Sequence, residues 1–169
     1  EVYESAGYPF IIPELRDNRM EWELAERGAL DKLIQLRDIR GIVHAHSDYS
    51  DGSNTLKEMA YHCKEQGFEY LVISDHSKSA FYADGLKEDK ILQQHQEIDL
   101  LNRELAPFRI FKSIESDILN DGSLDYDNDV LQSFDLIIAS VHSQLRMNEE
   151  KAMQRLIKAV ENPYTTILG

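Results

Sequence analysis

Short apolar runs recur along this chain, and a potential metal ligand follows each of four of them. The runs are rich in β-branched and aromatic residues and are bounded by polar ones, which is typical of buried strands. They cover residues 41–43, 70–73, 109–114 and 135–141. Because segments of helical pattern separate them, we expect parallel strands joined by crossovers, with all carboxyl ends on one face. Parallel α/β sheets and barrels bind their ligands at that face.

The candidate ligands are imidazoles and carboxylates. In chain order they are His44, His46, Asp51, Asp75, His76, Glu115, Asp117 and His142. These groups suit zinc, manganese or iron, whereas a closed structural zinc site normally includes thiolates. The only cysteine, Cys63, lies elsewhere in the sequence. Residues two positions apart in an extended segment point the same way, so His44 and His46 could reach one ion.

A carboxylate such as Glu115 could bridge to a second ion. Two ions ~3.5 to 4 Å apart stabilise both the attacking and the leaving oxygen of a phosphoryl transfer, and metal binding lowers the pKa of water from ~15.7 towards ~7. Simpler structural roles are open to single residues: Asp51 could begin an Asp-Gly turn, and His76 or His142 alone would more often be a hydrogen-bonded histidine. Four such segments at converging strand ends favour metal-dependent hydrolysis instead.

Four motifs stand in the order found in the polymerase and histidinol phosphatase (PHP) domain superfamily, which the chain resembles from about residue 38 to residue 169. They are residues 44–52 (HAHSDYSDG), 74–77 (SDHS), 115–117 (ESD) and 140–143 (SVHS). Within the superfamily, the chain resembles the C-terminal PHP domain of bacterial family X DNA polymerases. Residues 8–16, 38–41 and 117–126 carry this second resemblance.

The resemblance implies an α/β fold, a parallel β/α barrel of the distorted seven-stranded PHP (TIM-like) type, to which this chain contributes about five strands. Residues 1–40 would be a lead-in from a preceding polymerase region, and residues 41–169 the N-terminal part of the PHP domain. The family pattern places another histidine ligand just after Gly169 and an Asp-x-His pair well beyond it. We therefore expect a C-terminally incomplete domain in which each metal lacks a ligand.

The resemblance also implies roles for individual residues. The metal ligands would be His44, His46 and Glu115 for one ion, Glu115 and His142 for a second, and Asp51 and His76 for a third. A complete site would hold two or three divalent ions, manganese or zinc, with iron as a further option. The catalytic residues would be Glu115, His142, Asp75, Lys78 and Arg146. Asp75 and Asp117 would orient ligands, while Lys78 and Arg146 could contact phosphate or be solvated surface.

By the same resemblance, a metal-activated hydroxide would hydrolyse phosphodiesters at DNA 3′ ends, giving 3′-5′ exonuclease and end-processing activity in a family X repair polymerase. The partners would be DNA ends and the polymerase domains that precede this region. A small-molecule phosphatase of histidinol-phosphatase type is an alternative, although residues 8–16 count against it. A non-catalytic scaffold of a polymerase is another, although the intact ligands count against that.

The composition sets wider limits. A chain of 169 residues with 42% hydrophobic residues can bury one sizeable core, and a single cysteine excludes an internal disulfide framework. We find no signal peptide and no apolar run of about 18 residues, so we expect a cytoplasmic protein. The formal charge of -13 opposes simple nucleic-acid binding, unless bound cations and the polymerase domains supply positive charge.

Helix signals complete the pattern. We expect helices at residues 20–27, ended by Gly28, at residues 87–105, and from Asn148 onward. Thr55 and Glu58 form a capping box that begins another helix, which ends at Gly67. His62 and His95 lie on polar parts of the expected helices, so we expect both at the surface, and Cys63 in the core.

Overall fold

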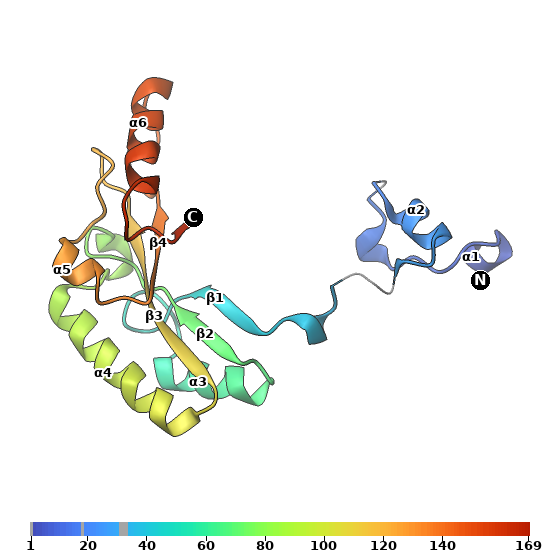
Figure 1. The fold of residues 1–169 in the computed structure, drawn as a ribbon, viewed down its shortest axis with the longest axis horizontal. Helices are drawn as coiled ribbons and strands as arrows, with labels where there is room; N and C mark the ends of the chain where they lie inside the picture. Colours follow the sequence, from blue (N-terminus) through green and yellow to red (C-terminus); the bar gives the residue numbers. More distant parts are fainter. Residues whose placement is uncertain (1, 18, 31–33) are drawn as a thin grey trace. The chain divides into compact units, whose positions relative to one another are not determined.

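The computed structural model describes residues 2–17, 19–30 and 34–169. The chain divides into two compact units, Glu1–Ile39 and Arg40–Gly169, each of which is described by itself (Figure 1). No helix among the described residues is both long and apolar enough to span a bilayer.

The first unit is built from short helices around aromatic side chains. Its elements are α1 (Val2–Ser5), η1 (Pro13–Leu15), α2 (Glu21–Glu26) and η3 (Leu36–Asp38). The Trp22 ring stacks on Tyr3 at 6.0 Å and meets Tyr8 edge-on at 5.2 Å. Gly28, which has a φ of 62°, follows α2 as the sequence predicted.

The second unit contains a five-stranded sheet in which every neighbouring pair is parallel. In sheet order the strands are β1 (Gly41–Ala45), β2 (Tyr70–Ile73), β3 (Arg109–Asp117), β4 (Leu136–Ser140) and β5 (Ile167–Leu168). They curl into a half-barrel, which confirms the prediction of an incomplete parallel β/α barrel. Strand β3 runs farther than the predicted residue 114 and carries Glu115 and Asp117 within it.

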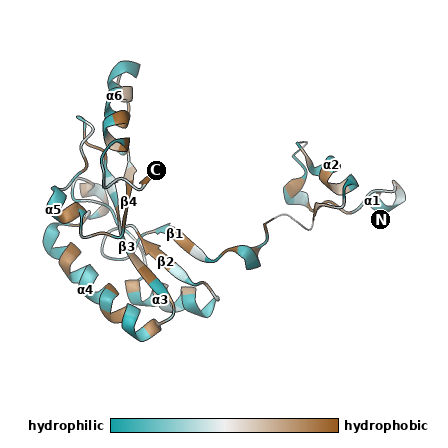
Figure 2. Cartoon of the chain, viewed as in Figure 1, coloured by the Kyte–Doolittle hydropathy of each residue, from teal (hydrophilic) through white to brown (hydrophobic). Residues whose placement is uncertain are grey.

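Helices connect the strands as crossovers. They are α3 (Leu56–Glu65), α4 (Glu88–Leu105), α5 (Asn128–Leu131) and α6 (Glu149–Val160), with the short η4 (Phe81–Ala83) before α4. The capping box of α3 is present, since Thr55 accepts a hydrogen bond from the Glu58 amide and Glu58 accepts one from the Thr55 amide. Figure 2 shows apolar residues concentrated on the strands and polar ones on much of α4.

Two apolar clusters hold the sheet and helices together. One packs α3 and α4 against β2 and β3 and includes Leu71, Ile98, Ile110 and, as predicted, Cys63. The other surrounds β3 and β4 and includes Ile114, Ile137, Leu131 and Ala159. Both leave the carboxyl ends of the strands free to carry polar groups.

The predicted surface position of His95 is wrong. Its side chain is buried, and its ring meets Phe134 edge-on at 4.9 Å. The reason is helical periodicity: His95 follows Ile91 by four positions and precedes Ile98 by three, and both isoleucines face the core. His62 is exposed, as predicted.

Candidate metal centre

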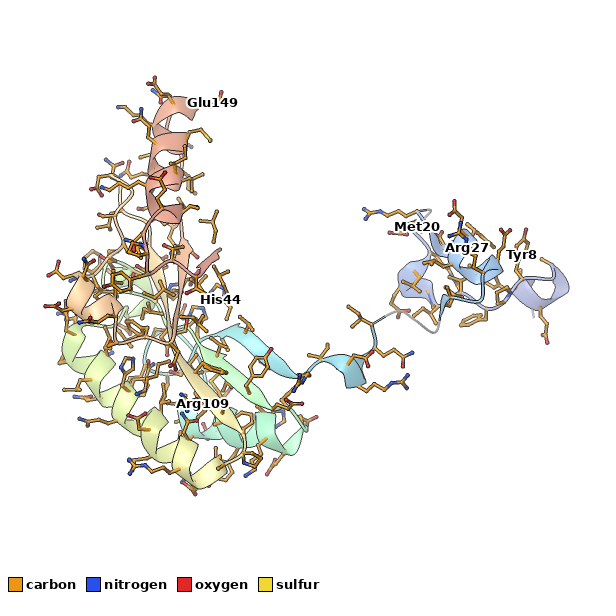
Figure 3. The ribbon with its side chains drawn as sticks, in the orientation of Figure 1. Tyr8, Met20, Arg27, His44, Arg109 and Glu149 are labelled. Carbon is orange, nitrogen blue, oxygen red and sulfur yellow. The ribbon has the colours of Figure 1, made fainter. Side chains whose placement is uncertain are left out.

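The predicted ligands gather at the carboxyl ends of the strands. His44 lies near the end of β1, His76 follows β2, Glu115 lies in β3, and His142 follows β4. Figure 3 shows His44 towards the end of the sheet opposite Arg109, the first residue of β3. The parallel register therefore brings together side chains that are far apart in sequence.

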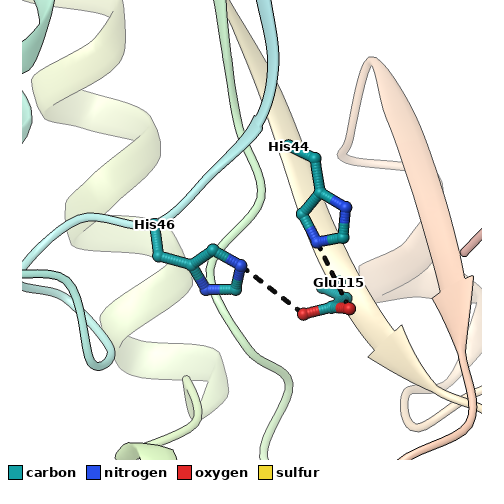
Figure 4. A group of neighbouring side chains, drawn as sticks. All are labelled: His44, His46 and Glu115. Carbon is teal, nitrogen blue, oxygen red and sulfur yellow. Dashed lines mark ion pairs between the residues drawn. The ribbon is translucent and has the colours of Figure 1, made fainter. Parts of the chain in front are cut away.

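Four imidazoles converge on the single carboxylate of Glu115. The distances are 3.2 Å from His44 Nε2 to Oε1, 3.1 Å from His142 Nε2 to Oε1, 3.5 Å from His46 Nε2 to Oε2, and 3.1 Å from His76 Nδ1 to Oε2. Figure 4 shows the His44 and His46 rings, each joined to the Glu115 carboxylate by a dashed line that marks an ion pair. Glu115 is 6% exposed, so the contacts lie largely out of water.

Asp51 extends the cluster on the side of His46 and His76. Its carboxylate lies 3.4 Å from His46 Nδ1 and 3.7 Å from His76 Nε2. The structure thus brings together three sets of potential ligands. They are His44, His46 and Glu115; His46, Asp51 and His76; and His76, Glu115 and His142.

This donor set fits divalent cations. One buried carboxylate cannot neutralise four protonated imidazoles, whereas divalent cations could accept the lone pairs of the neutral rings. His46 Nδ1 and His76 Nδ1 are buried without a hydrogen-bond partner, although carboxylate oxygens lie nearby. Ligands bound ~2.0 to 2.2 Å from a shared ion lie roughly 3 to 3.6 Å apart, which is close to the separations observed.

The pKa shifts of His46 and Glu115 favour the ionisation states that metal binding requires. Burial, followed by the charge of His76, lowers the pKa of His46, which favours the neutral imidazole. Burial alone would raise the pKa of Glu115. Interaction with the Ser140 side chain and the charges of His142 and His44 outweigh this effect, so the pKa of Glu115 is lowered.

The backbone at His44 departs from the expected extended conformation. His44 has a φ of 65°, and the pairing of β1 with β2 shifts register between Ile42 and Ala45. Such irregularities re-aim a side chain at the end of a strand, and a non-glycine residue rarely adopts positive φ. His44 and His46 both reach Glu115, but through this irregular turn of the chain and not through simple strand alternation.

Asp75 lies behind the ligands and does not face Glu115. Its carboxylate is fully buried and accepts hydrogen bonds from the Ser47 amide and hydroxyl, the Ser50 hydroxyl and the Gln94 amide group. These contacts fix the loop that carries His46 and Asp51. The geometry therefore gives Asp75 a positioning role.

Asp117 supports His142 directly. The His142 Nδ1 lies 2.6 Å from Asp117 Oδ1, and Ser79 donates a hydrogen bond of 3.2 Å to the other carboxylate oxygen. Burial alone would lower the pKa of His142. Hydrogen bonding to Asp117 and the charge of Glu115 outweigh this effect, so the pKa of His142 is raised overall. A carboxylate that holds one nitrogen of a ligand histidine fixes which nitrogen faces the ion.

Lys78 and Arg146 lie apart from the cluster. The Lys78 ammonium donates to Glu88 at 2.7 Å and sits 5.1 Å from the centre of the Tyr126 ring. Arg146 lines a separate surface cavity with Asp121. In the described part of the chain, neither cation forms an ion pair with Asp51, Glu115 or Asp117.

Sequence reasoning missed three supporting residues. Ser47 and Gln94 hold Asp75, as described above. Arg155, 3% exposed, donates to the carbonyl oxygens of Leu119, Ser143 and Ile118, and so ties α6 to the end of β3 and to the loop after His142. The available signal for Arg155 was its place four positions before Ala159 on the buried face of α6.

The chain belongs to the PHP domain family, whose model matches residues 43–166. It is 43% identical, over all 169 residues, to the DNA polymerase/3′-5′ exonuclease PolX of Bacillus subtilis (strain 168), of which it covers 29%. It is 25% identical over 137 residues to a probable phosphatase of Caldanaerobacter subterraneus subsp. tengcongensis. This match covers 75% of the present chain and 49% of the phosphatase. A probable phosphatase of Thermoanaerobacter sp. (strain X514) is 24% identical over 131 residues, again 75% of this chain and 51% of that one.

Proposed function

We propose that this chain is part of a metal-dependent phosphodiesterase that hydrolyses DNA at 3′ ends, within a longer protein that also contains polymerase domains. Residues 1–40 would lead in from those domains, and residues 41–169 would form the N-terminal part of the PHP domain. The observation that carries the proposal is the convergence of four imidazoles on Glu115. The similarity to the PolX protein supports the choice of DNA as substrate.

The complete site would hold two or three divalent ions, manganese or zinc, and this chain would supply part of the ligands of each. The proposed ligands are His44, His46, Asp51, His76, Glu115 and His142, with Glu115 shared between ions. Ions bound there would polarise a phosphate and lower the pKa of a water molecule. His76 lies close to both Asp51 and Glu115, so it connects two of the three ligand sets.

The remaining residues would prepare the site. Asp117 keeps a proton on His142 Nδ1, which leaves Nε2 available as a ligand. Asp75 fixes the loop of His46 and Asp51. Lys78 and Arg146 stay candidates for contacting phosphate, although Lys78 would have to exchange its present partner, Glu88.

A small-molecule phosphatase is the second candidate, because two relatives are described as probable phosphatases and match three quarters of this chain. Their identity of 24 to 25% is well below the 43% shared with the PolX protein. A non-catalytic scaffold would not require six potential ligands to lie so close together.

The test is manganese-dependent release of nucleotides from a 3′-recessed oligonucleotide, compared with phosphate release from histidinol phosphate. For the longer protein that contains the complete PHP domain, we expect release from the oligonucleotide and a loss on the order of 100-fold in Glu115→Gln, since the metals supply several kcal/mol of transition-state stabilisation. His62→Ala changes an exposed histidine of α3 and serves as the control. Faster hydrolysis of histidinol phosphate would favour the phosphatase, and equal rates in Glu115→Gln and the parent chain would refute the assigned site.

A further inference from the structure

Two neighbouring aromatic side chains project into solvent beside the metal centre. Phe81 and Tyr82 are 86% and 72% exposed, although aromatic residues usually bury most of their surface. The Tyr82 ring lies 6.1 Å from the ring of His76, with an edge-to-face orientation. Tyr82 therefore lies beside a proposed ligand, and the proposed reaction gives neither aromatic residue a role.

The loop that carries this pair is firmly anchored. Ala80, Ala83 and Leu86 are buried, and the Leu86 amide donates to the His76 carbonyl at 2.8 Å. At Gly85, a Cβ atom would lie 1.8 Å from the Ser77 carbonyl oxygen, so only glycine allows this close approach. The loop folds its small and aliphatic residues inward and holds the two aromatic rings outward.

Lysines lie next to the rings in a chain that is otherwise strongly acidic. Phe81 lines a cavity of about 260 Å³ together with Lys78, Lys87, Lys90, Asp84 and Asp89. Lys78 pairs with Glu88 and Lys90 donates to the Tyr49 carbonyl. In the described part of the chain no carboxylate forms an ion pair with Lys87, so its ammonium is available to an anion.

We propose that Phe81 and Tyr82 form a platform on which bases of a single-stranded DNA end stack, with Lys87 contacting a backbone phosphate. This inference rests on the proposed function, because it places the platform beside the phosphodiester to be hydrolysed. Stacking uses the uncharged faces of bases, so it suits a chain whose formal net charge of -13 opposes phosphate binding.

A protein partner fits these observations less well. A stable protein interface buries roughly 800 Å² on each side, which is far more than two side chains supply. A small phosphate ester would not need two exposed aromatic rings in addition to the metals. A short single strand matches the size of the platform, its aromatic character and the adjacent lysine.

A fluorescent reporter tests the platform without hydrolysis. Phe81→Trp is made together with Trp22→Phe, because Trp22 is the only native tryptophan. The reporter is titrated with a phosphorothioate oligothymidylate, which resists hydrolysis, and with an abasic strand of the same length. We expect fluorescence quenching by oligothymidylate and binding on the order of 10-fold weaker for the abasic strand. Equal affinity for the two strands, or no quenching by either, would overturn the platform.

Variants without the reporter test the same point by fluorescence anisotropy of labelled strands. The double change Phe81→Ala and Tyr82→Ala should remove the preference for bases over abasic sites, whereas Leu100→Ala, at an exposed position of α4, should keep it. Lys87→Ala should reduce the slope of log affinity against log salt by about 0.7, while Lys57→Ala should leave it unchanged. A double variant that keeps the full preference for bases would contradict the proposal.

The outcomes separate this inference from the proposed function. If this chain prefers base-bearing strands but the longer protein with the complete PHP domain releases no nucleotides, the platform is retained and the phosphodiesterase assignment is lost. A chain that releases nucleotides but binds abasic and base-bearing strands equally loses the platform and retains the phosphodiesterase assignment.

Discussion

His142 donates its Nδ1 proton to Asp117 across 2.6 Å, and this contact turns its Nε2 atom towards Glu115 at 3.1 Å. Asp117 is buried and can only accept when ionised, which fixes the tautomer of the neutral ring. The lone pair of Nε2 then points into the group of ligands around Glu115. Asp117 thus orients His142, which we propose as a metal ligand.

Replacing Asp117 by asparagine should weaken metal binding by about 10- to 100-fold. The amide keeps the size of the side chain but loses the charge that holds the His142 proton. Manganese affinity measured by isothermal titration calorimetry checks this. Asp129→Asn, at an exposed position of α5, is the matched control and should retain the parent affinity. An unchanged affinity in Asp117→Asn would show that His142 needs no such support.

The positions of the candidate ligands could be predicted because they depend on strand order alone. His76 and Glu115 each follow or end an apolar run, and parallel strands present such positions on one edge. Cys63 and the capping box at Thr55 could be predicted for similar reasons, since helical spacing and capping chemistry are local properties.

Other features depend on tertiary contacts that periodicity does not encode. The positive φ of His44 arises where β1 loses register with β2, and no local residue preference indicates it. Helical spacing places His95 on the buried face of α4, but it does not indicate the contact with Phe134, which comes from a distant segment. Helical spacing could have placed Arg155 on the buried face of α6, but it does not indicate the three carbonyl oxygens that accept hydrogen bonds from this side chain.

Asp75→Asn should destabilise the fold by roughly 2 to 4 kcal/mol, because it places an amide donor opposite groups that already donate. The loop carrying His46 and Asp51 should loosen as well. Urea unfolding gives the change in free energy, and manganese titration reports on the loop. Gln94→Leu removes one donor and leaves the other three, so it should cost less than Asp75→Asn. The reverse order would contradict the network as described.

Stability should fall as the pH drops from about 6.5 to about 4 because His95 is buried in its neutral form. Burial, followed by the charge of Lys112, lowers the pKa of His95 to about 4, although Asp99 and Asp135 act in the opposite direction. Below pH 6.5 His95 takes up a proton in the unfolded chain but stays neutral in the folded chain. The folded state therefore loses stability until the pH falls below the pKa of His95 in the folded chain. The full difference is on the order of 3 kcal/mol.

His95→Leu should therefore reduce the loss of stability between pH 7 and pH 5. Urea unfolding at both pH values, with a chelator present, measures the change, because a chelator keeps metal release from adding its own pH dependence. His62→Leu is the matched control on an exposed position of α3 and should follow the parent chain. Parallel pH curves for His95→Leu and the parent chain would mean that His95 does not titrate in this range.

Arg155→Met should cost about 3 kcal/mol or more, since three backbone carbonyl oxygens would lose a charged donor inside the protein. Lys158→Met is a matched control on the same helix: Lys158 pairs with Asp121 at the surface, where an ion pair contributes less than about 1 kcal/mol. Because Arg155 also holds the carbonyl of Ser143, its loss should displace the loop after His142 and weaken manganese binding. Urea unfolding and manganese titration of both variants check the two effects separately. If Arg155→Met loses stability but binds manganese as tightly as Lys158→Met, then Arg155 secures α6 and has no influence on His142.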